Sequence, residues 1–367
     1  MPKRLLGPLC VFVVCGILTL GLWPFHSPAN DVRWLKGAHG LSLDGEGTLF
    51  SEPSLDFRGT THSIEVWAST RIIRAGATLL AVYNPNSKDC ATVSVTRSVA
   101  DLKIQTRQEN SYFDIVKHKF YVDDVFQPDE PLFLTITFST HGTRLYVNGV
   151  PRSTSSSFTI PDCTVAGSRL VLGDSAGQSD GWVGEIRGLA IYQTELAEDQ
   201  VKRHFETWTT SGRPVWEGSN GNRTLYLFDE GEGSVAHDQG NGKLRLEMPA
   251  RYAVIDKQVL AGFWDEFSGT TGYWLDFANN VIGFVPVGFC FCAYLANNTR
   301  LRHPVRIAVL LGVGLSLTIE LTQPFLATRE SDMTDLITNT VGTIAGAALY
   351  VRSASWYQRQ FHRSFFY

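Results

Sequence analysis

Polar side chains recur at helical intervals in the apolar C-terminal part of the sequence. Residues three or four positions apart share one face of a helix, so these side chains form two polar faces that can meet. An unpaired carboxylate is costly in hydrocarbon, so Glu320 must face protein or water. The predicted polar pocket contains Asn280, Ser316, Glu320, Gln323, Arg329, Asp332, Asp335 and Asn339.

Three roles are open for this predicted pocket. It can be a structural clamp, in which Asp332 and Asp335 cap a helix N-terminus, where acids are favoured. It can carry a proton, with Glu320 or Asp335 as a general base, which would make the chain an intramembrane enzyme. It can contact a ligand, since Arg329 suits a phosphate or carboxylate. The sequence shows no phosphate loop, metal-spaced histidine set or Ser-His-Asp order that would identify a catalytic site.

Apolar segments long enough to cross a membrane must position this pocket. The first covers residues 5–23 and is long for a signal peptide, so we expect a retained transmembrane helix over residues 1–25. Three further spans are expected, which makes an α-helical membrane bundle of four transmembrane helices. The further segments are residues 280–296, 305–325 and 334–351, followed by a basic tail over 352–367.

Basic residues predict how these helices are oriented, because lysine and arginine collect on the cytoplasmic side. One cluster precedes the first span, one lies between the second and third, and one follows the fourth. The clusters are Lys3 and Arg4; Arg300, Arg302 and Arg306; and Arg352, Arg359 and Arg363. We therefore expect a multi-pass protein of the plasma (inner) membrane, with cytoplasmic termini and residues 26–275 extracytoplasmic.

Residues 31–260 have the pattern of an antiparallel β-sandwich. Short alternating or β-branched runs such as HSIEVWAST and LFLTITFST are separated by Gly, Pro, Asn and Ser clusters. Asn148-Gly149 is a strong hairpin turn, because both residues accept positive φ. One helix is expected over residues 194–207. Many short strands with regular turns predict two packed sheets.

Charge and cysteine use constrain the partners and the compartment. The net charge is −4, and no basic stripe interleaved with aromatic residues is visible, so we expect no nucleic-acid partner. Four of the six cysteines lie in apolar runs, where they act as small hydrophobes. Cys90 and Cys163 lie in the soluble part and can form a disulfide if that part is extracytoplasmic. Their geometry is not readable from the sequence, so the pairing stays open.

The soluble part resembles the laminin G / concanavalin A-like lectin jelly roll. The similarity rests on LSLDGEGTLF, HSIEVWAS, LTITFSTHGTRLYVNGVPR and LVLGDS with GWVGEIRGLAIYQTELAEDQV. The resemblance implies an all-β sandwich that binds carbohydrate or protein, in some members through calcium. The candidate calcium ligands are Asp44, Asp174, Asp238 and Asn241. The alternative is that Asp and Asn beside Gly only form turns.

A later stretch, LYLFDEGEGSVAHDQGNGKL, resembles the strand and Asp-rich loop that usually open such a domain. We interpret residues 225–247 as a permuted opening strand, and the alternative is a second copy too short to fold alone. Hydrolases with this fold use two carboxylates. Glu65 and Glu185 each stand alone on their strand, so we do not expect sugar cleavage.

The membrane part resembles the VanZ-like family, which is named for a glycopeptide (teicoplanin) resistance protein. The similarity covers residues 276–351. It rests on Asn280-x-x-x-Phe284-x-Pro286-x-Gly288, Ser316-x-x-x-Glu320-x-x-Gln323 and Arg329-x-x-Asp332-x-x-Asp335-x-x-x-Asn339-x-x-Gly342 with Gly346. The resemblance implies one membrane bundle with the lectin-like domain inserted between its first and second spans. Gly342 and Gly346 would let the last helix pack closely on a neighbour.

Together these patterns predict an integral membrane protein of the cell envelope. The lectin-like domain would bind glycan or protein, and the polar pocket would contact a lipid-linked precursor or a glycopeptide-type ligand beside membrane lipid. The alternative is a non-catalytic adhesion or scaffold protein whose helices only anchor the outer domain. An intramembrane enzyme is the further alternative.

Overall fold

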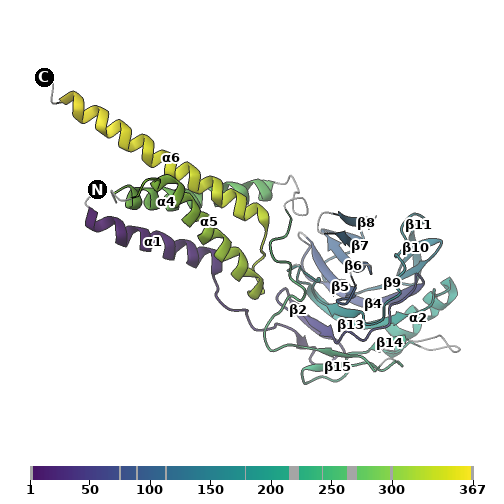
Figure 1. Cartoon of the computed structure of the whole chain (residues 1–367). Helices are drawn as coiled ribbons and strands as arrows, with labels where there is room; N and C mark the ends of the chain where they lie inside the picture. The colour runs from purple at the N-terminus through teal and green to yellow at the C-terminus, as the bar shows by residue number, and fades with distance from the viewer. Residues whose placement is uncertain are drawn as a thin grey trace. The chain divides into compact units, whose positions relative to one another are not determined.

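The chain forms two compact units in a computed structural model (Figure 1). The helical unit consists of Met1–Ser27 and Lys257–Tyr367, and the sandwich unit is Pro28–Asp256. The structure describes residues 3–73, 76–87, 90–111, 114–177, 179–214, 223–241, 243–262, 271–297 and 301–364. Arg300 of the second basic cluster lies outside these described residues.

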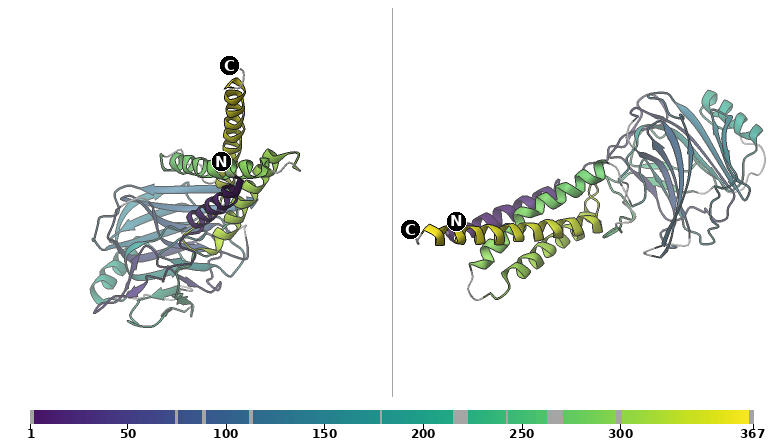
Figure 2. Two further views of the ribbon diagram at one scale, coloured as in Figure 1. Left: turned by 90° about the vertical axis from the view of Figure 1, so that its left-hand side faces the viewer. Right: turned by 90° about the horizontal axis from the view of Figure 1, so that it is seen from above.

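The described residues of the helical unit form four long helices and one short 3₁₀ turn. The elements are α1 (Lys3–Leu22), α4 (Thr271–Ala296), α5 (Pro304–Thr322), η1 (Gln323–Phe325) and α6 (Met333–Ser364). Both chain termini lie at the same end of this unit (Figure 2). Apolar side chains of α1 pack against Phe284 and Val287 of α4 and Ile319 of α5.

Among the residues that the structure describes, three helices are long and apolar enough to cross a membrane, over Leu5–Leu22, Thr271–Ala296 and Pro304–Phe325. Length and hydropathy therefore support three of the four predicted spans. The fourth predicted segment is helical in α6, but Asp335, Asn339 and several threonines make its first half too polar. Its 32 residues extend about 48 Å, which exceeds the roughly 30 Å of a bilayer core.

Glycines bring α6 into direct backbone contact with α4. A Cβ placed on Gly342 would lie 2.2 Å from the carbonyl oxygen of Val281, and one on Gly346 would lie 2.0 Å from that of Val285. Neither distance is possible for a real side chain. The prediction that these two glycines allow close packing is therefore confirmed.

The sandwich unit contains two antiparallel sheets. The first runs in the order β1 (Arg33–Trp34), β2 (Leu41–Asp44), β13 (Val183–Tyr192), β4 (His62–Thr70), β9 (Leu132–Ser139), β10 (Gly142–Val147) and β11 (Val150–Ser155), with β14 (Arg223–Tyr226) also paired to β13. The second runs β15 (Val235–His237), β16 (Arg245–Glu247), β3 (Leu49–Ser51), β12 (Arg169–Leu172), β5 (Ala77–Tyr83), β6 (Thr92–Ser98), β7 (Asp101–Ser111) and β8 (Asp114–Val122). β14 to β16, which follow the helix, thus extend both sheets.

The hydrophobic core fills the space between the sheets, as the alternating pattern predicts. Ile64 and Val66 of β4 are fully buried there, and so are Leu80 and Leu172 from the opposite sheet. The predicted hairpin turn joins β10 to β11, with Asn148 at φ 51° and Gly149 at φ 74°. The sandwich unit also begins and ends side by side: the backbone N–H of Tyr252 donates to Pro28 O at 3.0 Å.

The predicted helix is displaced along the sequence. It was expected over residues 194–207 and is observed as α2 (Glu198–Ser211). The reason is Ser63 of β4, whose hydroxyl donates to Thr194 O at 2.8 Å and accepts from Leu196 N at 3.0 Å. These bonds hold residues 194–196 against the sheet, so the helix begins only after Ala197, whose N–H donates to the Gln200 side chain at 2.9 Å.

The close approach of α4 and α6 generates a stability prediction. Gly346→Ala must push two backbones apart, so we expect it to lower the free energy of unfolding by about 1–3 kcal/mol. Gly283→Ala is the matched control, because a Cβ at Gly283 of α4 meets nothing within 4 Å. The measurement is the thermal unfolding midpoint of the purified protein in detergent. Equal midpoints for the two variants would contradict this packing.

Candidate functional site

Glu320 lies at the centre of the polar side chains in the helical unit. It comes from the last turn of α5 and is only 1% exposed. Its Oε2 accepts the backbone N–H of Asp332 at 3.0 Å, and its carboxyl group also bonds to the Ser331 side chain. Both partners precede α6, so one carboxyl group ties the end of α5 to the start of α6.

The first turn of α6 adds two more carboxyl groups. Oδ1 of Asp332 accepts the N–H of Asp335 at 2.7 Å, so Asp332 caps α6 as acids do at helix N-termini. The side-chain amide of Asn280 on α4 donates to Asp335 Oδ1. Three helices therefore contribute to one set of contacts.

Deeper in the helical unit, two amide groups are buried. Nδ2 of Asn339 donates to Ser316 Oγ at 3.0 Å, and Nε2 of Gln323 donates to Gly21 O of α1 at 3.2 Å. Asn339 is 5% exposed and Gln323 is 7% exposed. The carbonyl oxygens Asn339 Oδ1 and Gln323 Oε1 have no hydrogen-bond partner among the residues that the structure describes. A buried acceptor without a donor costs roughly 1–3 kcal/mol.

Arg329 contacts the C-terminal end of α1. Its Nε donates to Trp23 O at 2.8 Å and its Nη2 to Leu20 O at 3.2 Å. These carbonyls are the unsatisfied groups at the C-terminal end of α1, which basic side chains commonly cap. The guanidinium thus anchors the α5–α6 connection to α1.

A segment that precedes α4 closes over the same connection. The ammonium group of Lys257 donates to the carbonyl oxygens of Leu326, Ala327 and Arg329. The N–H of Ala261 donates to Ser331 O at 2.9 Å, and Met333 N donates back to Ala261 O at 2.9 Å. We call residues 257–262 the strap. Sequence reasoning missed it, because one lysine in a polar connection gives no signal.

The structure thus places six of the eight predicted pocket residues in two bonded sets, one of Asn280, Glu320, Asp332 and Asp335 and one of Ser316 and Asn339, while Gln323 and Arg329 contact α1. We call these six residues, with Ser331, the polar cluster. It contains Asn280, Ser316, Glu320, Ser331, Asp332, Asp335 and Asn339.

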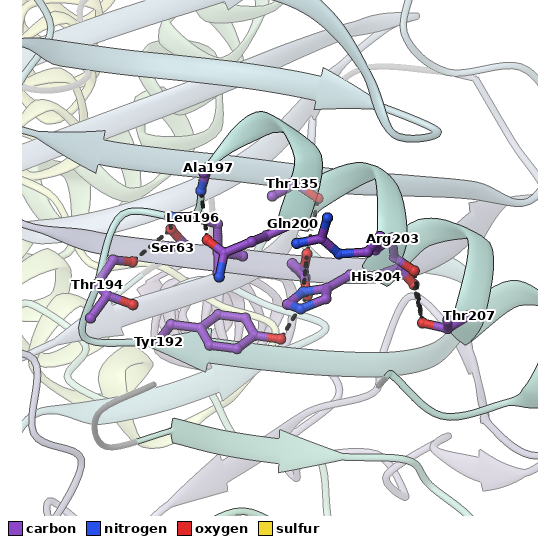
Figure 3. A network of polar contacts seen from close by, with 11 residues as sticks. Ser63, Thr135, Tyr192, Thr194, Leu196, Ala197, Gln200, Arg203, His204 and Thr207 are labelled. Atoms are coloured by element: carbon purple, nitrogen blue, oxygen red, sulfur yellow. Dashed lines mark hydrogen bonds and ion pairs between the residues drawn. The ribbon is translucent and has the colours of Figure 1, made fainter. Parts of the chain in front are cut away.

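A second buried carboxylate network lies in the sandwich unit and was also missed (Figure 3). Glu65 of β4 is 0% exposed. Its carboxylate accepts from Tyr192 Oη at 2.7 Å and Thr135 Oγ1 at 3.4 Å, and it lies 3.1 Å from Nδ1 of His204 on α2. Burial and the charge of Glu65 raise the pKa of Tyr192 well above its usual value, so its hydroxyl stays protonated. The network attaches α2 to the first sheet.

The four calcium candidates are each engaged separately. Asp44 forms an ion pair with Arg71, and Asn241 donates its backbone N–H to Arg223 O. Asp238 accepts backbone N–H groups from Leu225, Gly240 and Leu244. Within the described part of the chain, no group of three or more His, Cys, Asp or Glu residues is arranged to hold a metal ion. The side chains of Asp174 and Asp238 accept backbone N–H groups of their own loops, as turn-forming aspartates do, and the calcium site stays a prediction.

Asp174 is the most deeply buried of these candidates, at 0% exposure. Its Oδ1 accepts the N–H groups of Ser175 at 2.8 Å and Asp180 at 2.7 Å, and Tyr252 donates its hydroxyl to Oδ2. Burial raises the pKa of Asp174 to about 7, against the opposing effect of these hydrogen bonds. Asp174 therefore links the loop after β12 to the end of the sandwich unit.

Two other features of the sandwich unit bear on binding. Cys90 and Cys163 form a disulfide. A cavity of about 400 Å³ lies beside the β10–β11 turn, where Asn148 and Arg152 face the connection from β8 to β9. The lining of this cavity includes the basic residue Arg152 and the acidic residues Asp124 and Glu130.

Comparison with known proteins confirms both predicted resemblances. Residues 227–355 match the VanZ/LLP1 family, and residues 44–202 match the concanavalin A-like lectin/glucanases superfamily. No curated protein matches the chain.

Several solved structures resemble the chain at low identity. A SAP-like pentraxin from Limulus polyphemus has 12% identity and a TM-score of 0.38, covering 61% of this chain and 93% of the pentraxin. A putative carbohydrate binding protein from Bacteroides ovatus has 12% identity and a TM-score of 0.41, covering 62% of each chain. The IT-sialidase CBM40 of Ruminococcus gnavus has 14% identity and a TM-score of 0.33, and the match covers 45% of this chain and 94% of the CBM40 chain.

Asp174 generates a pH prediction. Between the usual pKa of 3.8 and about 7, the native state keeps a proton that the unfolded state has released. The free energy of unfolding should therefore fall as pH rises through this range, by up to about 4 kcal/mol. Asp174→Asn should remove this slope, because asparagine does not ionise. The free energy of unfolding is measured at several pH values by guanidinium unfolding, followed by tryptophan fluorescence. An equally steep fall with pH in the Asp174→Asn variant would contradict the raised pKa of Asp174.

Proposed function

We propose that this chain, a VanZ-like membrane protein with a concanavalin A-like lectin domain inserted after its first helix, acts at the cell envelope. The sandwich unit binds a glycan or protein ligand outside the cytoplasm. The polar cluster of the helical unit contacts the head group of a lipid-linked precursor or a glycopeptide-type ligand. The match to both families supports the combination, and the ligand class is our inference.

In this proposal the helical unit is a four-helix membrane bundle with cytoplasmic termini in the plasma (inner) membrane. Three apolar helices support it, and α6 joins them through its glycine contacts with α4. The common end of the two termini supports an even number of crossings (Figure 2). The three basic clusters set the direction by the positive-inside rule.

One observation carries the ligand-binding role: two buried amide oxygens beside the carboxyl groups lack a donor. Asn339 Oδ1 and Gln323 Oε1 have no partner among the described residues, although both side chains are more than nine-tenths buried. A hydroxyl or N–H group of a ligand would satisfy them. Asp276, one turn before Asn280 on the same face of α4, is exposed. Polar groups therefore continue from the cluster to the surface.

The ligand-binding role predicts a specific effect at Glu320. Glu320→Gln keeps the size of the side chain and replaces its carboxyl group with an amide, so we expect loss of the envelope phenotype, including tolerance of glycopeptide antibiotics, to the level of a deletion strain. Glu330→Gln is the matched control, since Glu330 lies on the same connection and is exposed. Growth is compared at equal expression and membrane insertion. Normal growth of the Glu320 variant would count against the proposal.

The adhesion or scaffold alternative is favoured by another observation. Glu320, Asp332 and Asp335 each have a partner inside the helical unit, so the cluster already serves as a clamp between helices. In that case the sandwich unit attached to an unrelated membrane anchor would keep full activity. Loss of activity in this chimaera, with binding by the sandwich unit intact, supports a role for the helical unit.

The topology predicts which cysteines a membrane-impermeant maleimide reaches. In a background without the unbonded cysteines, Val150→Cys at an exposed position of β11 should be labelled in intact spheroplasts. Arg302→Cys, in the α4–α5 connection, should be labelled only after the membrane is permeabilised. The reverse pattern would overturn the proposed orientation.

A further inference from the structure

The cavity of about 400 Å³ beside the β10–β11 turn has two walls. One wall is the connection from β8 to β9, over residues 124–132, and the other is the β10–β11 hairpin, over residues 147–152. β11 is the last strand of the first sheet, β8 is the last strand of the second, and the two strands adjoin. The cavity therefore lies beside the place where the edges of the two sheets meet.

Hydrogen bonds join the two walls of this cavity. The backbone N–H of Asn148 donates to Phe133 O at 2.8 Å, and its side-chain Oδ1 accepts from Phe133 N at 2.9 Å. Nη2 of Arg152 donates to Asp123 O at 3.3 Å and so links β11 to the connection. The cavity is therefore preformed, which lowers the entropy cost of binding a ligand.

The lining of the cavity combines apolar and polar side chains. Val125 and Leu132 are buried, so they form the inner part of the lining, and Val150, at 63% exposure, forms part of its outer edge. Asp124, Gln127, Glu130, Asn148 and Arg152 supply the polar groups. A few convergent polar groups around an apolar surface are typical of ligand pockets.

Three of these polar side chains are not used by the fold. Asp124 and Glu130 form their hydrogen bonds through backbone N–H groups, to Asp101 Oδ1 at 3.0 Å and Gln127 O at 3.4 Å. Within the described part of the chain, the carboxylates of Asp124 and Glu130 and the side-chain amide of Gln127 have no hydrogen-bond or ion-pair partner. Exposed polar side chains ordinarily contact water, but these three converge on one cavity.

We propose that this cavity binds one sugar ring of a glycan, of a kind that carries no anionic group. The apolar C–H groups of the ring would lie against Val125, Leu132 and Val150. The carboxylates of Asp124 and Glu130 would accept hydrogen bonds from ring hydroxyls, which are stronger than bonds between neutral groups. The inference rests on the proposed glycan binding of the sandwich unit and names the site and the class of sugar.

Size and charge restrict the sugar. Ligand pockets have volumes of roughly 300–1,000 Å³, so a cavity of about 400 Å³ suits one ring better than a longer oligosaccharide. Its lining contains two carboxylates and one guanidinium group. A sugar with a carboxylate, sulfate or phosphate would therefore meet an excess of like charge, which costs binding free energy.

The test uses the full chain in nanodiscs of phosphatidylcholine. The probes are fluorescent polyacrylamide chains that carry one kind of sugar each, because many copies on one chain strengthen weak binding. The sugars are glucose, galactose, mannose, N-acetylglucosamine, glucosamine and, as the anionic sugar, glucuronic acid. We expect at least one of the first five to bind, and glucuronic acid to bind at least tenfold more weakly than that sugar. A polymer with aminoethyl groups and no sugar measures binding of a cation alone.

Two pairs of substitutions locate the site. Asp124→Asn with Glu130→Gln keeps the size of both side chains and removes the charged acceptors, so it should weaken binding of the preferred sugar at least tenfold. Asp129→Asn with Glu195→Gln is the matched control, because both residues are exposed acids of the sandwich unit outside the cavity lining. The control pair should change binding less than twofold.

The outcomes separate this inference from the proposed function. Equal binding by the two double variants would place the sugar elsewhere on the sandwich unit and overturn the inference. Glucuronic acid binding as tightly as the other sugars, or the aminoethyl polymer binding as tightly as glucosamine, would overturn the class of sugar. Absence of binding by all six sugars would overturn the inference as well. The proposed function fails on a different result, which is normal growth of the Glu320→Gln strain.

Discussion

The bond between the carboxyl group of Glu320 and the backbone of Asp332 is the interaction around which the helical unit is organised. A carboxyl group at this depth is tolerated only when protein groups replace water. Its partners come from the α5–α6 connection, which must therefore fold back over α5. Two side chains hold that connection in place. Lys257 of the strap donates to carbonyl oxygens of the connection, and Arg329 of the connection donates to carbonyl oxygens at the end of α1. The ends of α1, α5 and α6 are thus mutually dependent.

The sandwich unit also contains a buried carboxyl group whose partners come from distant segments. Glu65 is buried in the first sheet, and its partners Tyr192 and His204 come from β13 and α2. Removal of one partner would leave a carboxylate buried with too few donors, which is more destabilising than loss of an exposed ion pair. In both units a buried acid therefore specifies which distant segment must pack above it.

Local regularity made part of the site predictable. Helical spacing identified the faces that carry Ser316 and Asn339, and the structure joins them at 3.0 Å. The contact of Arg329 with α1 could not be predicted, because its carbonyl partner in Trp23 lies 306 residues away and backbone acceptors leave no mark in a sequence. The strap escaped notice for the same reason. The fourth span was harder to assess from composition: glycines lower the hydropathy of α6, although Gly342 and Gly346 are what allows it to approach α4.

The adjacent ends of the sandwich unit have an evolutionary consequence. Tyr252 bonds to Pro28, and Asn30 bonds to Ala250, so the chain leaves and returns through a single paired stem. A module with such a stem can be gained, lost or exchanged as one cassette, because the host needs only a short opening between two of its segments. Selection can then alter the inserted sandwich unit while the helical unit keeps its ancestral form.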